Sequence, residues 1–171
     1  MNIPERISAL RALMEERGYD VYMVPTDDFH QSEYVGDHFK VREYITGFTG
    51  SAGTAVFTKD EAGLWTDGRY FLQADQQLAG PGVKLYKMGE PGVPTVEEFI
   101  ASALPEGGTL GFDGRVVAIE EGAALEEAVA SKNAKINYSE DLVGEVWADR
   151  PALSEKPAFA LGEEYTGCLL Y

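Results

Sequence analysis

Residues 47–74 read GFTGSAGTAVFTKDEAGLWTDGRYFLQA, and this stretch decides the fold. Three glycines stand three positions apart and lead directly into a β-prone run at 54–58. A second β-prone run at 63–66 follows a short connector. Two such runs joined in this way predict a β-hairpin.

Helical and strand patterns extend in both directions from this hairpin. Asp67 and Gly68 predict a turn, after which apolar residues recur at helical spacing over 70–78. Further helices are predicted at 3–18, around 40–45, from the Thr95 capping box to Pro105, and at 119–131, and further strands at 20–24, 83–86, 109–113 and 135–138. Alternating strands and helices predict an α/β fold, and the hairpin makes its sheet mixed, with helices flanking it.

Composition narrows the classes of function. The 171 residues suit one domain with a modest tail, and 44% of them are hydrophobic, which suffices for a core. Fourteen basic against 29 acidic residues leave a net charge of -15, which disfavours nucleic acid and membrane surfaces as partners. Cys168 is the only cysteine, which excludes an internal disulfide framework and indicates a reducing, cytoplasmic location.

The segment TGSAG superficially resembles a serine nucleophile elbow. Gly50 abuts Ser51, however, and a strand rather than a helix is predicted to follow. A glycine-permitted turn that enters a buried strand is therefore the favoured interpretation. A phosphate-binding P-loop is excluded because no Gly-Lys-Ser/Thr sequence follows.

Histidines near carboxylates raise the question of a metal site. His30 lies near Asp27, Asp28 and Glu33, and His38 follows an aspartate. No pair has the His-x-x-x-His spacing that places two ligands on one helical face. The alternative is that His30 forms a hydrogen bond within a loop and that His38 is solvated.

Arg69 is the most informative charged residue. It stands at the start of the helix predicted at 70–78, where the helix dipole disfavours a cation. A functional reason for this position would be contact with a carbonyl or carboxylate group of a ligand. The structural alternative is a fork-like ion pair with Asp67.

Two segments carry a resemblance to a known family. They are VPTDDFHQSEYVGDHFKVREYITGFTGSAGTAVFT at 24–58 and GLWTDGRYFLQA at 63–74. Together they resemble the N-terminal domain of the long-form Xaa-Pro aminopeptidases, which belong to the creatinase/prolidase, or pita-bread, metallopeptidases. The resemblance is dense over 21–78, weaker to 138, and resumes in LVGEVWADRP at 142–151.

The resemblance implies a cytoplasmic, homodimeric hydrolase that removes the N-terminal residue of peptides with proline in second position. Two manganese ions, or another divalent metal, would be held by the C-terminal domain, which is absent from this chain. The N-terminal α/β domain would contribute to substrate access and subunit assembly, with Arg69 reaching the substrate. His30 matches a loop histidine of the family that shapes the loop near the site. The chain would contain no catalytic residue and no metal ligand, and would be inactive alone.

The resemblance also suggests how the chain is divided. We expect an N-terminal α/β domain at 1–141, and a linker with the start of a truncated middle domain at 142–171. After Trp147 the chain is interrupted by prolines and ends in YTGCLLY, where residues 169–171 have no downstream partner. This ending indicates a piece of a longer protein. The rival hypothesis is a free-standing, non-enzymatic binding or oligomerisation module of the same fold, and the reading frame beyond Tyr171 discriminates between the two.

Overall fold

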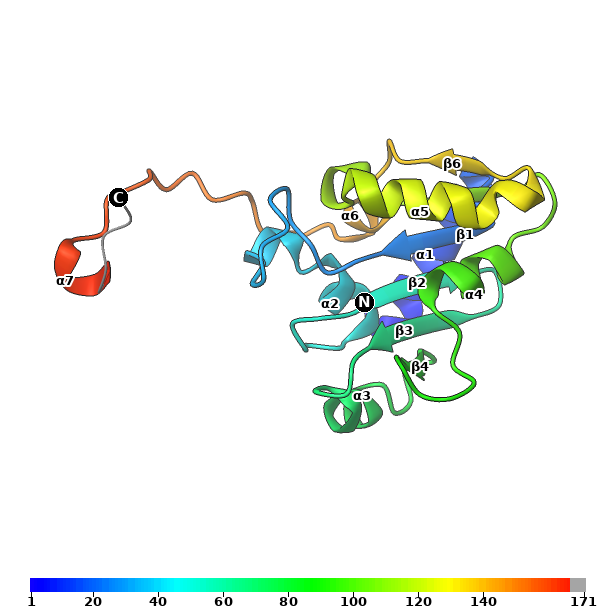
Figure 1. The fold of residues 1–171 in the computed structure, drawn as a ribbon, viewed down its shortest axis with the longest axis horizontal. Coiled ribbons are helices and arrows are strands. Elements are labelled where there is room, and N and C mark those ends of the chain that lie inside the picture. The colour runs from blue at the N-terminus through cyan, green and yellow to red at the C-terminus, as the bar shows by residue number, and fades with distance from the viewer. Residues whose placement is uncertain (167–171) are drawn as a thin grey trace.

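A six-stranded sheet forms the centre of the computed structural model, which describes residues 1–166 (Figure 1). The strand order is β4-β3-β2-β1-β5-β6, with β1 at Val21–Val24, β2 at Thr54–Thr58, β3 at Ala62–Thr66, β4 at Lys84–Lys87, β5 at Thr109–Gly111 and β6 at Lys135–Asn137. β2 is antiparallel to β1 and β3, whereas the β3–β4, β1–β5 and β5–β6 pairs are parallel. The mixed α/β sheet predicted from the sequence is thereby confirmed.

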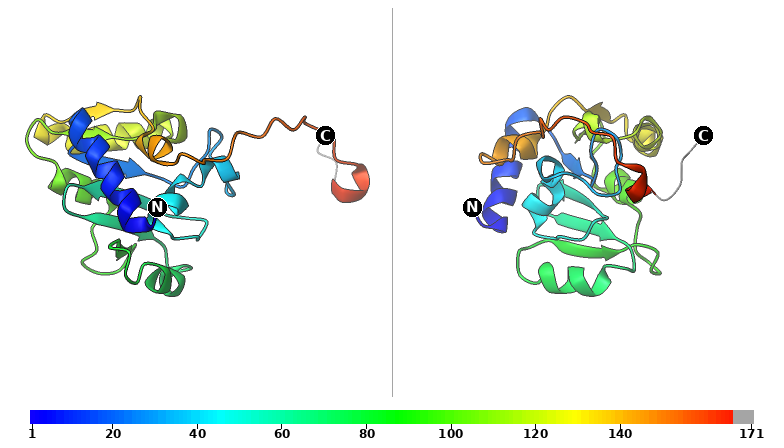
Figure 2. Two further views of the ribbon diagram at one scale, coloured as in Figure 1. Left: turned by 180° about the vertical axis from the view of Figure 1, so that it is seen from behind. Right: turned by 90° about the vertical axis from the view of Figure 1, so that its left-hand side faces the viewer.

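Helices cover both faces of the sheet (Figures 1 and 2). Their bounds are α1 Ile3–Arg17, α2 Val41–Thr46, α3 Phe71–Gln77, α4 Val96–Ala103, α5 Ile119–Val129 and α6 Leu142–Val146, with single 3-10 turns at Asp37–Phe39, Gly114–Val116 and Ala130–Lys132. Figure 2 shows α1 crossing the face opposite to α4 and α5. The sheet is therefore the middle layer of a three-layer sandwich.

Side-chain alternation in β1 divides the core in two. Tyr22 and Val24 belong to the apolar cluster beneath α1 and α6, while Val21 and Met23 belong to the cluster beneath α4 and α5. Successive side chains of a strand point to opposite faces, so a strand buried on both faces has no polar positions. All four residues are less than 5% exposed, which explains the uninterrupted apolar run in the sequence.

Gly63 allows two aromatic rings to pack on β3. The rings of Trp65 and Tyr86 stack with their centroids 4.0 Å apart and an interplanar angle of 1°. A Cβ at Gly63 would lie 2.6 Å from Trp65 and 2.8 Å from Tyr86. The glycine is therefore required by this packing, and Trp65, fully buried, is a core residue.

Helix α6 lies just beyond the boundary expected at residue 141. Leu142 and Val143 are fully buried and join the core cluster of α1. The compact unit therefore extends at least to Val146, five residues further than expected. Five residues are too few to show helical periodicity, and burial of α6 depends on α1, which lies far away in the sequence.

The chain leaves this unit at the edge where β1 and β3 end. Residues 151–162 are exposed and lead to the four-residue helix α7, Glu163–Thr166 (Figure 1). Cys168 and the apolar residues 169–171, singled out in the sequence, lie outside the described part. Residues 1–166 contain no helix whose length and apolar character match a membrane span. The linker and start of a middle domain at 142–171 stay a prediction.

Truncation of Leu142 tests whether α6 belongs to the folded unit. Leu142→Ala should lower the free energy of unfolding by about 2–5 kcal/mol, because it leaves a cavity in the core. Leu153→Ala is the matched control, since Leu153 is 47% exposed, and it should change this free energy by less than about 0.5 kcal/mol. Urea denaturation of the two variants measures both values, and equal effects would contradict the packing of α6.

Candidate functional site

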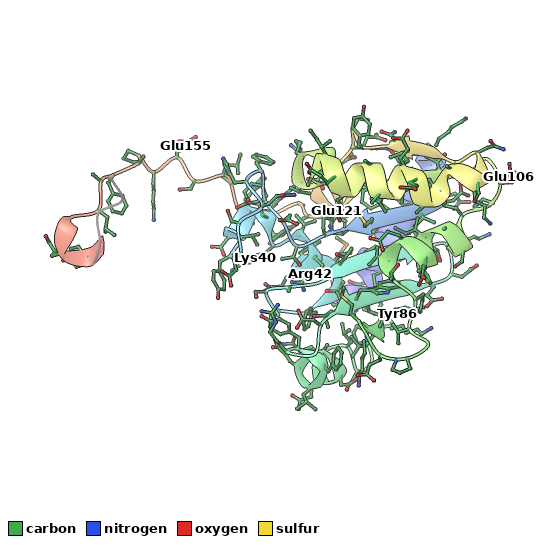
Figure 3. The ribbon with its side chains drawn as sticks, viewed as in Figure 1. Lys40, Arg42, Tyr86, Glu106, Glu121 and Glu155 are labelled. Atoms are coloured by element: carbon green, nitrogen blue, oxygen red, sulfur yellow. The ribbon has the colours of Figure 1, made fainter. Side chains whose placement is uncertain are left out.

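Three loops meet at the edge of the sheet where β1 and β3 end. The loop 25–36 follows β1, the glycine turn 47–53 precedes β2, and the turn 67–70 follows β3. They meet because β2 runs antiparallel to both neighbours, so its start lies between the ends of β1 and β3. Ligands of α/β sheets commonly bind beyond the carboxyl ends of parallel strands. Lys40, Arg42 and Glu121, which are labelled in Figure 3, lie toward this edge of the sheet.

Two neighbouring hollows lie among these loops. The first, of about 380 Å³, has Arg69 and Glu121 in its wall, and the second, of about 450 Å³, has Tyr34 and Arg42. The residues that line both hollows are Thr26, Glu33 and Ser51. We define the candidate site as these two hollows and the loops that line them.

Arg69 forms the ion pair that the structural alternative predicted. Its Nε and Nη2 donate to the two carboxylate oxygens of Asp67 at 2.9 and 2.8 Å. Hydrogen bonding from Arg69 holds the pKa of the Asp67 carboxyl below its usual value. The Arg69 side chain is nevertheless 67% exposed, and its Nη1 donates to no described residue. The ion pair orients the guanidinium and leaves part of it accessible to a ligand.

Asp27 and Asp28 differ in environment although they are adjacent. Burial raises the pKa of the Asp27 carboxyl, and the charge of Asp28 raises it further. The Asp28 carboxylate accepts hydrogen bonds from the backbone N–H groups of His30 and Ser32 at 2.8 and 3.1 Å, and the bond from His30 is the main cause of its lowered pKa. Asp28 therefore orders the loop, whereas Asp27 faces the hollow that contains Arg69.

The two histidines lie apart from any set of metal ligands. His30 is exposed, and its backbone, rather than its ring, bonds Asp28. His38 is half-buried, and its Nδ1 lies 2.7 Å from the Pro151 carbonyl oxygen, so it is not simply solvated. Among residues 1–166, no group of three or more His, Cys, Asp or Glu side chains is placed to hold a metal ion. The donor set of this part of the chain does not fit a dinuclear metal site.

Ser51 is part of a turn rather than a catalytic dyad. Its hydroxyl lies 2.6 Å from the hydroxyl of Tyr70, with which it shares a hydrogen bond. The strand β2 begins three residues later, as the sequence analysis predicted. A nucleophilic serine requires a neighbouring base, and a tyrosine hydroxyl in a hydrogen bond to it does not provide one near neutral pH.

Arg42 is the residue of this edge that sequence reasoning missed. The side chain is buried, and its guanidinium donates to Thr26 Oγ1 at 2.6 Å, to the Phe48 carbonyl at 2.5 Å and to the Gly50 carbonyl. Burial lowers its pKa to about 10, so it stays charged at neutral pH. Arg42 lies in a segment of mixed polarity without clear periodicity, so the sequence pattern did not indicate that its side chain is buried. Its hydrogen-bond acceptors lie on two separate loops, which the sequence does not show to be close together.

The sequence of this chain is similar to those of known proteins. The sequence model of the Creatinase/Prolidase N-terminal domain matches residues 6–145. Aminopeptidase P2 of Arabidopsis thaliana is 46% identical over 151 residues, which cover 86% of this chain and 21% of the plant protein. Probable Xaa-Pro aminopeptidase P of Pyricularia oryzae is 43% identical over 166 residues, which cover 95% of this chain and 27% of the fungal protein. The chain thus spans about a quarter of the length of these relatives.

Solved structures of peptidases are similar to this chain in fold. The X-prolyl aminopeptidase of Caenorhabditis elegans, described as a cytosolic enzyme with a di-nuclear active site, superposes with a TM-score of 0.88 and 34% identity over 98% of this chain and 29% of its own. The N-terminal domain of the cytoplasmic peptidase PepQ of Mycobacterium tuberculosis superposes with a TM-score of 0.60 and 27% identity over 83% of this chain and 98% of its own.

The mixed sheet between two layers of helices, with loop-lined hollows at its edge, defines an α/β domain. Its fold is similar to those of the matched structures, with TM-scores of 0.88 and 0.60. The chain belongs to the Creatinase/Prolidase N-terminal domain family.

Titration of Asp67 tests the ion pair at the site. In the wild-type chain its carboxyl pKa should lie below the ordinary 3.8, and Arg69→Ala should raise it toward that value. The pair stabilises the fold above about pH 5, and this stabilisation disappears as the pH falls through the lowered pKa.

NMR titration of side-chain carboxyl carbons measures this pKa directly. Asp37 is the matched control, because Lys40 lowers its pKa in the same way at a separate position. The pKa of Asp37 should be unaffected by Arg69→Ala. An Asp67 pKa that does not move would show that the guanidinium is not bound to this carboxylate.

Proposed function

We propose that the chain is the non-catalytic N-terminal domain of a metal-dependent Xaa-Pro aminopeptidase. The whole protein would remove the N-terminal residue from peptides whose second residue is proline. The observation that carries this proposal is the similarity to the X-prolyl aminopeptidase of C. elegans along nearly the whole chain. The names of the plant and fungal relatives agree with it.

In this proposal the metal ions belong to the part of the protein beyond this chain. The C. elegans enzyme is described as having a di-nuclear active site, and the donor set of residues 1–166 does not fit such a site. The domain would contribute groups that bind and orient the peptide, and two metal ions, manganese among the candidates, would supply the activated water. A cytoplasmic, homodimeric enzyme fits the proposal, with the C-terminal domain and a second copy as partners.

Arg69 is the residue of this chain that we assign to the peptide. It lies on the wall of the smaller hollow, and Asp67 holds its fork in one orientation. An oriented guanidinium binds a carbonyl or carboxylate oxygen better than a free one, because less side-chain entropy is lost. His30, on the exposed part of the loop 25–36, is assigned only to the shape of that loop.

The first test compares this chain with the whole protein. Purified chain 1–171, supplied with manganese and an Xaa-Pro peptide, should release no N-terminal residue, because residues 1–166 contain no group of three or more His, Cys, Asp or Glu side chains placed to hold a metal ion. The whole protein under the same conditions should release it. Turnover by chain 1–171 would contradict the non-catalytic assignment, and its absence in the whole protein would contradict the proposed activity.

The second test removes the guanidinium in the whole protein. Arg69→Ala should lower kcat/KM on Xaa-Pro peptides about 10- to 150-fold, the equivalent of the 1.5–3 kcal/mol typical of a hydrogen bond to a charged group. Metal content should stay unchanged. Arg69→Lys should restore little, since lysine lacks the planar fork.

Arg115 provides a matched control because it occupies a second Asp-Gly-Arg turn. Its Nε and Nη2 bond Asp113 at 2.9 and 2.8 Å, the same distances as in the Arg69 pair, but it follows β5 and lines neither hollow. Arg115→Ala should leave kcat/KM within about twofold of the wild type. Normal kinetics of Arg69→Ala, accompanied only by a lower melting temperature, would reduce Arg69 to a structural ion pair.

A further inference from the structure

The buried guanidinium of Arg42 is connected to the exposed guanidinium of Arg69 by a continuous set of contacts. We propose that Arg42 is a positioning residue that holds Arg69 in place on the wall of the site, acting through the glycine turn and Tyr70. This inference rests on the proposed function, because it assigns Arg42 an effect on peptide recognition. It concerns a residue that the proposed function does not assign to the peptide.

The first contact joins Arg42 to the glycine turn. Its guanidinium donates to the carbonyls of Phe48 and Gly50, and its carbon Cζ lies 4.8 Å above the Phe48 ring. Among residues 1–166, no carboxylate forms an ion pair with Arg42, although the side chain is only 3% exposed. Burying a charge costs several kcal/mol unless hydrogen bonds compensate it. The carbonyls of the turn are therefore held tightly, because they provide this compensation.

The second contact joins the glycine turn to Tyr70. Ser51 and Tyr70 share a hydrogen bond of 2.6 Å, and the rings of Phe48 and Tyr70 meet edge to face at 5.9 Å. A Cβ at Gly50 would lie 2.3 Å from the Phe48 ring and 2.8 Å from the Tyr70 ring. The turn is thus pressed against Tyr70 and cannot shift without moving it.

The third contact joins Tyr70 to the Arg69 turn. The Tyr70 backbone N–H donates to the Asp67 carbonyl at 3.0 Å, and the Arg69 guanidinium lies 5.3 Å from the centre of the Tyr70 ring. Nearby, the Thr66 hydroxyl donates to the Ala52 carbonyl at 2.7 Å, which ties the end of β3 to the same turn. A displaced glycine turn would therefore change the position of Arg69.

Arg42 also acts on the opposite wall of the site. Its Nε donates to Thr26, whose hydroxyl in turn donates to the Gly53 carbonyl at 2.6 Å. One side chain thereby connects the loop 25–36 to the glycine turn, and Thr26 lines both hollows. Lysine at this position would keep the charge but would lack the fork that reaches three acceptors in different directions.

Kinetics of the whole protein test this assignment. Arg42→Lys should raise KM for Xaa-Pro peptides about 5- to 20-fold and leave kcat within about twofold, because misplacing a binding group by a fraction of an ångström weakens recognition. In the Arg69→Ala background, Arg42→Lys should raise KM by a smaller factor than in the wild-type background, since Arg69 is gone and only the effect through Thr26 remains. Fully additive effects on KM, or an unchanged KM in Arg42→Lys, would overturn the proposal.

Arg11→Lys is the matched control. Arg11 also donates to a backbone carbonyl, that of Thr58 at 2.9 Å, but at the opposite end of β2. The Arg11→Lys variant should leave KM unchanged, whatever effect it has on the melting temperature. If Arg42→Lys does not fold, Ser51→Ala replaces it. Ser51→Ala removes the hydrogen bond to Tyr70, and KM should rise as in Arg42→Lys. An unchanged KM in Ser51→Ala would then overturn the proposal.

A measurement that does not depend on catalytic turnover separates the positioning role of Arg42 from the proposed function of the whole protein. Loosening of the Arg69 turn by Arg42→Lys should raise the Asp67 carboxyl pKa in chain 1–171, and Arg11→Lys should not. If the wild-type whole protein does not cleave Xaa-Pro peptides, the proposed function fails, and this pKa alone decides whether Arg42 positions Arg69. An Asp67 pKa that is the same in Arg42→Lys and wild type would overturn the positioning role.

Discussion

β2 runs antiparallel to both of its neighbours, and this single reversal places three loops at one edge of the sheet. Because β1 and β3 are parallel to each other, their ends lie on either side of the start of β2. The loop after β1, the glycine turn before β2 and the Asp-Gly-Arg turn after β3 consequently meet there. Every residue that we assign to the site depends on this arrangement, since none of the three loops contains a complete site by itself.

The site also depends on a buried charge in a protein whose net charge is -15. Arg42 has no carboxylate partner within the described part of the chain, and carbonyl and hydroxyl oxygens of two loops compensate its burial. An apolar residue would fill this space at a lower desolvation cost, but it would leave these oxygens without a donor. The guanidinium instead joins the loops into one unit. Arg69, by contrast, is exposed and paired with Asp67.

Sequence reasoning succeeded where a structure is encoded by neighbouring residues. The helix at α1 has its capping box and its glycine stop within the segment itself, and the hairpin has its two β-prone runs and connector in sequence. It was less successful with α6, whose burial comes from contact with α1, more than a hundred residues away. For the candidate site, it offered Asp67 as a possible ion-pair partner of Arg69, because the two lie two residues apart in one turn.

Local periodicity, turn residues and contiguous motifs encode the α/β class, the mixed sheet, the order of most elements and the resemblance to one family, so these features could be predicted from the sequence alone. That His38 bonds Pro151 and that Arg42 lies buried between two loops follows only from the tertiary structure. Hydrogen bonds of this kind join atoms that strand pairing brings together from distant segments. Their partners are set by the topology of the sheet, which no local pattern specifies.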